Sequence, residues 1–232
     1  MRNSTLYTAI GHFQRRQTQS GRYPVILINQ KEYMVDVQEM VLWTCLNWRI
    51  QDLDQLRAVY DNTAKDVAHT FTRSFEECVH RLTTRGLVVS GTGETGFEAL
   101  YDLVSTLYVV PVSSSRPLRL LTFFKLIFRN HVPYRKARIL FQKDKPNEDE
   151  RRVLGLSRQA LLSTAEIIKC VETGTYDVST DDAILDALYD DEDTTSRNIG
   201  WQMKVSAKRE QVTLAVANLY LRKQIIFQRV GL

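Results

Sequence analysis

Six residues near the middle of the chain, 91–96 (GTGETG), match the G-x-G-x-x-G spacing of loops that hold a dinucleotide. They follow an expected strand at residues 87–90 and precede an expected helix at residues 97–107, as that chemistry requires. The next extended segment, residues 108–112, leads into serines and offers no acidic side chain for a ribose. We therefore interpret the glycines as a tight turn, in which they permit a positive φ.

Side chains that could bind a metal or carry out catalysis are scattered. Cys78 and His80 are the closest pair of metal-ligand types, but they point to different sides of one expected helix. No serine or cysteine stands in the local sequence of a known nucleophile. The cysteines are odd in number and far apart on expected apolar faces, as reduced core thiols are: Cys45, Cys78 and Cys170. We expect no metal, no cofactor and no enzymatic activity.

The composition is that of a globular protein that is mildly basic. Among 232 residues, 44% are hydrophobic and 25% are charged, and the net charge is +4. This charge is compatible with nucleic acid and equally with a solvated basic surface. The longest apolar stretch, residues 118–128, contains Arg119 and Lys125 and is shorter than the roughly 20 residues of a membrane span. We expect a cytoplasmic protein without a membrane segment or secretion signal.

The first half shows a hairpin followed by three helices. Residues 24–29 (PVILIN) and 32–37 (EYMVDV) predict two strands, and the polar residues before them predict an arm or an added strand. Residues 38–48 and a segment capped by Asp52 predict two helices. The third helix begins with a capping box at Ser74 and Glu77, and Gly86 ends it: its apolar residues are Phe75, Cys78, Val79 and Leu82.

The second half repeats this plan more loosely over residues 138–230. Residues 143–149 predict a polar loop, and helices are expected at 159–171, at 181–189 and from Ser206 to Leu221. This aligns Leu42, Leu56, Val79 and Leu87 with Ile168, Leu185, Val216 and Ile225. Serines at 113–115 and Pro117 predict a boundary between domains 1–115 and 116–232. We expect an α+β, mostly helical fold of tandem units with short β-hairpins.

The first half resembles the winged-helix superfamily. The resemblance rests on the helices from VLWTCL through DLDQLRAVY and on the ending VHRLTTRGLV, residues 79–88, and covers about fifty residues. The same half, with its leading hairpin, is similar to the small chaperone domains that bind leader peptides. After Ser90 the chain departs from both patterns, because a helix follows where a wing would return as a strand.

The winged-helix resemblance implies a recognition helix in the major groove of double-stranded DNA. The first half offers Arg73, Arg81 and Arg85, but Glu76 and Glu77 would face the phosphates. The long helix of the second half is richer in suitable groups: Lys204, Lys208, Arg209 and Gln211. We predict a DNA-binding transcriptional regulator that uses this second helix and works as a homodimer.

The leader-peptide resemblance implies an alternative: an adaptor that binds a peptide or protein partner. The edge of the hairpin would add an extended peptide as a further strand, with Tyr33 and Val35 in contact with it. Two charged stretches leave further alternatives open. Residues 177–193 hold eight acids and no Lys or Arg, and form either a solvated surface or a face for a basic partner. Residues 116–145 interleave nine Lys or Arg with aromatics, which suits single-stranded nucleic acid or a core with snorkelling cations.

Overall fold

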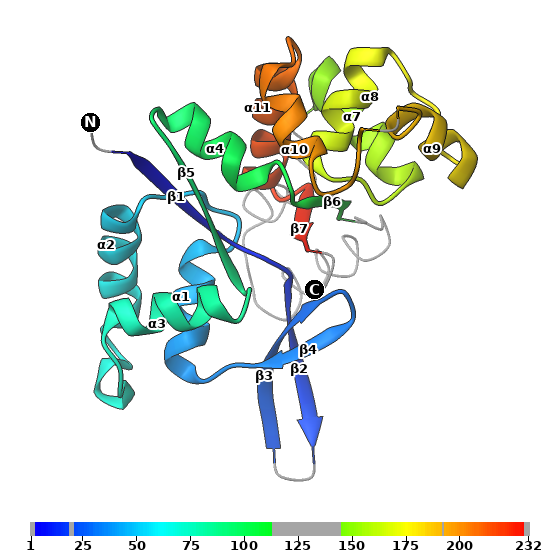
Figure 1. Ribbon diagram of the computed structural model, residues 1–232. Coiled ribbons are helices and arrows are strands. Elements are labelled where there is room, and N and C mark those ends of the chain that lie inside the picture. Colours follow the sequence, from blue (N-terminus) through cyan, green and yellow to red (C-terminus); the bar gives the residue numbers. More distant parts are fainter. Residues whose placement is uncertain (1–2, 19–20, 113–144, 192, 230–232) are drawn as a thin grey trace.

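The computed structural model describes residues 3–18, 21–112, 145–191 and 193–229. They form an α+β fold of helices and three small antiparallel sheets (Figure 1). The expected boundary residues 113–117, the apolar stretch at 118–128 and nearly all of the basic stretch lie outside the described residues. No helix in the described part of the chain has both the length and the apolar character needed to cross a bilayer.

The first half is built on a strand pair that brings the start of the chain beside residue 90. Strand β1 (Ser4–Ala9) pairs antiparallel with β5 (Val88–Gly93). Beneath this pair pack three helices with a single 3₁₀ turn between the last two: α1 (Val37–Leu46), α2 (Leu53–Ala64), η1 (Ala68–Thr70) and α3 (Phe75–Thr84). The capping box expected at Ser74 and Glu77 is present, and Asp52 caps α2. The polar segment before the hairpin therefore supplies strands.

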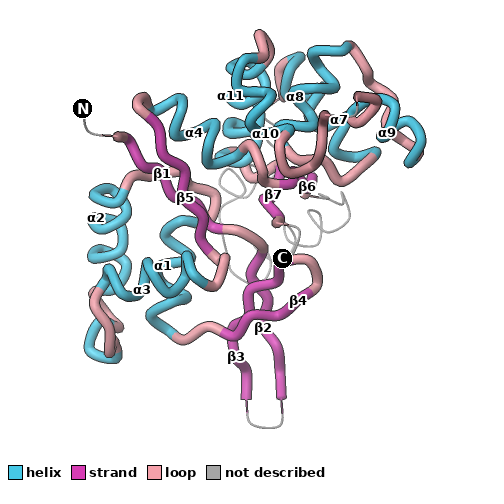
Figure 2. Tube along the Cα trace, viewed as in Figure 1, coloured by secondary structure: helices cyan, strands magenta, loops and turns pink. Residues whose placement is uncertain are grey.

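The second sheet has the order β2-β3-β4 and projects from the body of the protein (Figure 2). Its strands are β2 (His12–Thr18), β3 (Gly21–Ile28) and β4 (Lys31–Met34). The expected hairpin is confirmed, and Asn29 and Gln30 form its two-residue turn with positive φ at both positions. Both outer strands, β2 and β4, are sheet edges.

The glycine segment is not the tight turn that the sequence predicts. Gly91 and Gly93 lie within β5, and neither has a positive φ. Their role is close packing against α4 (Gly96–Val104), because a Cβ on Gly91 would lie 2.2 Å from the backbone N of Leu103. Only Glu94 and Thr95 separate strand from helix.

The second half repeats a strand pair beside a helical layer. Strand β6 (Tyr108–Pro111) pairs antiparallel with β7 (Ile225–Gln228). Its helices are α7 (Glu148–Gln159), α8 (Thr164–Thr173), α9 (Asp181–Leu188), α10 (Ile199–Gln202), η3 (Met203–Val205) and α11 (Arg209–Leu221). The sequence did not predict helix α7, and the expected loop at 143–149 covers only its first two residues. Its charged residues and Gly155 hide the apolar stripe of Val153, Leu154 and Leu156.

The same backbone bond occurs once in each half. The N–H of Tyr7 on β1 donates to the carbonyl of Gln51 at 2.8 Å, and that of Val109 on β6 donates to Leu162 at 2.9 Å. Each acceptor directly precedes the N-cap residue of a helix, Asp52 for α2 and Ser163 for α8. Helix α8 is therefore the counterpart of α2.

The ends of α3 and α11 also match. Leu87 N–H bonds to the carbonyl of Leu82, and Gln224 N–H bonds to that of Leu219, both at 2.9 Å. Counterparts are thus α1 with α7, α2 with α8, and α3 with α11. The alignment expected from sequence paired Leu42 of α1 with Ile168 of α8, and Leu56 of α2 with Leu185 of α9. Both pairs are wrong by one helix, because the sequence did not predict α7.

The two halves meet at a buried tyrosine. The hydroxyl of Tyr220 on α11 accepts from Thr8 Oγ1 at 2.9 Å and from Trp48 N at 3.0 Å, and donates to the carbonyl of Ala9 at 3.2 Å. Its ring stacks on Phe227 with centroids 4.4 Å apart. The division at residue 115 stays a prediction: β6 precedes that residue and bonds to β7, which follows it.

The three cysteines are free and buried, as expected of core thiols. Burial raises the pKa of the Cys78 thiol to about 12 and that of Cys170 to about 11, so both remain protonated at neutral pH.

Candidate functional site

The arginines expected to contact DNA in the first half are engaged within the protein. Glu39, the capping-box carboxylate of α1, is 1% exposed. It accepts from Arg81 Nε at 2.6 Å and from Arg85 Nη1 at 2.8 Å, and Arg73 pairs with Asp36. These cations therefore neutralise acids at the start of α1, and a phosphate would have to compete with them.

The Glu39 carboxylate is charged at neutral pH. Burial acts to raise its pKa, but hydrogen bonds from Arg85 and Arg81 outweigh burial and hold the pKa below its ordinary value of 4.5. A carboxyl whose pKa is depressed on folding stabilises the fold above its unfolded pKa. That contribution is lost as the pH falls below about 4.5 and through the folded pKa.

The second half contains the same device. Glu150, the capping-box carboxylate of α7, is fully buried and accepts from Arg222 Nη1 at 3.1 Å. Arg222 and Arg85 are both the C-cap residue of their helix, α11 and α3. The repeated ion pair supports the view that the halves share one structural plan.

The residues expected to contact DNA in the second half lie in different surroundings. Gln211 donates to Asp149, and the Arg209 guanidinium lies 5.2 Å from the ring centroid of Phe97. The side chains of Lys204 and Lys208 have no hydrogen-bond or ion-pair partner within the described ranges. Most of α11 is buried, which leaves a narrow outward stripe: Glu210, Leu214, Asn218 and Leu221. The major groove of DNA could therefore contact the first turn of α11 but not the rest of the helix.

The residues expected to bind a peptide lie on β4 or just after it. Val35 is 8% exposed and belongs to the core, and Tyr33 is half-buried against it. On the outer edge of β4, the carbonyl of Met34 already accepts from Arg85. The β4 edge is thus short and partly occupied.

The β2 edge is longer and open. Hydrogen-bonded and non-hydrogen-bonded pairs alternate along an antiparallel ladder, and Pro24, which lacks an N–H, pairs with Arg15. Arg15 is therefore in a non-hydrogen-bonded pair, and its N–H and C=O point away from β3. The same holds for Phe13 and Gln17, two residues to either side. These outward groups have no partner in the part of the chain that the structure describes.

A depression with a volume of about 310 Å³ adjoins this edge. Phe13, Tyr23 and Pro24 line it from the sheet, Met40 lines it from α1, and Arg15 lies at its rim. Phe13 is 38% exposed, and every side chain from His12 to Gln17 is exposed. The sequence marked these residues only as a polar arm, because apolar alternation along HFQRRQT is absent apart from Phe13.

The charges along β2 are positive. Arg15 lies 5.8 Å from the Phe13 ring centroid and forms no ion pair with any described residue, whereas Arg16 pairs with Glu32 on β4. The edge therefore combines open backbone groups, an apolar depression and an unpaired cation. An extended segment with an apolar side chain beside an acidic one fits all three features.

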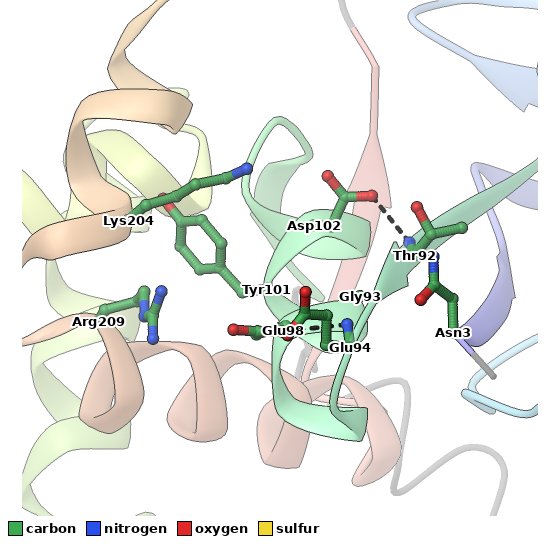
Figure 3. Close-up of a pocket in the computed structure, with 9 residues that line it drawn as sticks. All are labelled: Asn3, Thr92, Gly93, Glu94, Glu98, Tyr101, Asp102, Lys204 and Arg209. Atoms are coloured by element: carbon green, nitrogen blue, oxygen red, sulfur yellow. Dashed lines mark hydrogen bonds between the residues drawn. The ribbon is translucent and has the colours of Figure 1, made fainter. Parts of the chain in front are cut away.

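A separate cavity of about 390 Å³ lies beside the turn from β5 to α4 (Figure 3). Residues 92–94 of the glycine segment border it. Glu98 accepts from the N–H groups of Glu94 and Thr95, and Thr95 accepts from Glu98 N. A capping box thus uses the groups that a pyrophosphate would need. Within the described ranges, no three potential metal ligands of the His, Cys, Asp and Glu types gather.

Comparisons with known proteins give no match to this chain, whether with protein-family models, curated proteins or solved structures.

Proposed function

We propose that the protein is a non-catalytic adaptor that binds an extended segment of a partner protein along the outer edge of β2. The observation that carries the proposal is the open edge itself, three residues of which direct both backbone groups away from the sheet. An added strand would pair with Phe13, Arg15 and Gln17. Backbone bonds would supply affinity irrespective of sequence.

Specificity would come from the side chains next to the edge. The depression between Phe13, Pro24 and Met40 accommodates one apolar side chain of the added strand. Arg15 adds a preference for an acidic neighbour, because its guanidinium has no carboxylate partner among the described residues. This site differs from the Tyr33 and Val35 edge expected from sequence, because Val35 is a core residue.

Selection from a random peptide library displayed on phage tests the adaptor proposal. We expect enriched peptides to hold an apolar residue next to an acidic one. Gln17→Pro removes one outward N–H without breaking a bond to β3, and is expected to weaken binding about tenfold. Gln17→Thr retains the N–H and serves as the control. A library without enrichment, or equal affinity for the proline variant, would refute the proposal.

Double-stranded DNA binding by a homodimeric, winged-helix regulator is the second candidate. It is favoured by Lys204 and Lys208 near the start of α11, which lack partners among the described residues. Fluorescence anisotropy with random duplex DNA at two salt concentrations measures this DNA binding. We expect affinity to fall with salt, and replacement of either lysine by alanine to reduce the salt slope by about 1. Lys31→Ala, on the distant hairpin, is the control, and absence of binding at low salt would exclude this candidate.

A further inference from the structure

The cavity beside α4 has walls of opposite charge (Figure 3). Lys204 on η3 and Arg209 on α11 come from the second half of the chain, and Glu94, Glu98 and Asp102 come from the turn and helix after β5. No pair of these groups lies within 4.0 Å as an ion pair. The cavity therefore holds opposite charges apart.

The two cations of the cavity are not neutralised, and one of them, Arg209, is held against aromatic rings. The guanidinium of Arg209 lies 5.2 Å from the ring centroid of Phe97 and 5.5 Å from that of Tyr101. The Tyr101 hydroxyl donates to the carbonyl of Gly200 at 2.6 Å, which fixes the ring against α10. Lys204 is exposed, and its side chain forms no hydrogen bond or ion pair within the described residues. Both side chains line the cavity, and neither charge is paired with a carboxylate of the described residues.

The acids differ in what they can offer a ligand. Asp102 accepts from Thr92 N at 2.8 Å and Glu98 accepts from the turn, so their carboxylates help to hold the wall. The Glu94 carboxylate forms no hydrogen bond with any described residue. It is the free acid of the cavity, opposite two free cations.

We propose that this cavity binds a small zwitterion of the α-amino acid class, with its carboxylate at Lys204 and Arg209 and its ammonium group at Glu94. The volume of about 390 Å³ lies in the range of small-ligand sites, roughly 300–1,000 Å³. A phosphate or nucleotide fits poorly, because three carboxylates oppose two cations. A simple amine would leave both cations unpaired. Only a ligand with both charges satisfies both walls.

The binding assay uses the full chain and the twenty standard amino acids as probes. Thermal unfolding identifies an amino acid that raises the melting temperature, and calorimetry gives its affinity. The same compound is then compared with its carboxamide and with its des-amino acid. Each analogue lacks one charge, and each is expected to bind at least about tenfold more weakly. The proposal is overturned if none of the twenty amino acids binds, or if both analogues bind as tightly as the parent amino acid.

Two variants locate the binding in this cavity. Lys204→Met is expected to weaken binding of the amino acid but to have little effect on binding of its carboxamide, because the variant removes a partner of the ligand carboxylate, which the carboxamide lacks. Glu94→Gln is expected to weaken binding of the amino acid and to leave binding of the des-amino acid unchanged, because the des-amino acid has no ammonium group. Lys208→Met lies outside the cavity lining and is the control. Unchanged affinity in both cavity variants would place binding elsewhere and refute the site, whatever the outcome at the β2 edge.

Discussion

Replacing Arg222 by methionine is expected to lower the free energy of unfolding by about 2 kcal/mol. The change leaves the Glu150 carboxylate, which is fully buried, without an ion-pair partner among the described residues. Removal of one member of a buried pair typically costs roughly 3–5 kcal/mol, and we expect less here because Arg222 is itself 40% exposed. Urea unfolding followed by circular dichroism measures the difference.

The counterpart in the first half provides the matched comparison. Arg85→Met is expected to have a smaller effect, because Arg81 still donates to Glu39. The double variant Arg81→Met with Arg85→Met is expected to reach or exceed the cost of Arg222→Met. Equal stability losses for the two single variants would contradict this explanation, since it attributes the difference to the second arginine.

Substitution of Gly91 by alanine is expected to have the other large effect, a loss of about 3 kcal/mol or failure to fold. The new Cβ would lie 2.2 Å from Leu103 N and 2.5 Å from the carbonyl oxygen of Ala99, both of them backbone atoms that cannot turn aside. Strand β5 and helix α4 would have to separate. The loss would appear as a lower urea midpoint.

Gly96→Ala is the control within the same motif. A Cβ there meets nothing within 4 Å, the φ is not positive, and alanine is the better helix former at the first position of α4. We expect stability to be unchanged or slightly raised. If Gly96→Ala were as damaging as Gly91→Ala, close packing of β5 on α4 would not explain the glycine spacing.

Local signals in the sequence predicted much of the fold. Ser74 with Glu77 fixed the start of α3, and Gly86 marked its end, because capping is decided by residues three or four positions apart. The hairpin turn was equally local, although the structure places it at Asn29 and Gln30, one residue before the gap between the expected strands. The pairing of β1 with β5 could not be predicted, because it joins residues that are 79 to 89 positions apart and depends on the folded core.

The candidate site was less predictable than the fold. Arg81 and Arg85 have the charge that a phosphate contact requires, and only the position of the buried Glu39 shows that they are engaged. The capping box of Asp36 and Glu39 is visible in the sequence, but its burial is not. The open edge of β2 follows from the strand order β2-β3-β4, in which β3 is central. Strand order is a property of the whole sheet and cannot be read from the residues of one strand.

The Tyr220 hydroxyl also constrains the order of folding. Its partners Thr8 and Ala9 precede it by more than two hundred residues, so this part of the core closes only after the chain has been synthesised through α11. Until then the Trp48 N–H and the Ala9 carbonyl lack the Tyr220 hydroxyl as a hydrogen-bond partner, whereas Thr8 Oγ1 can still donate to the carbonyl of Arg49. Contacts of such long sequence separation slow folding, because the entropy of closing the loop is lost before the contacts can stabilise the fold. During synthesis, therefore, the first half gains these hydrogen bonds only once α11 has been made.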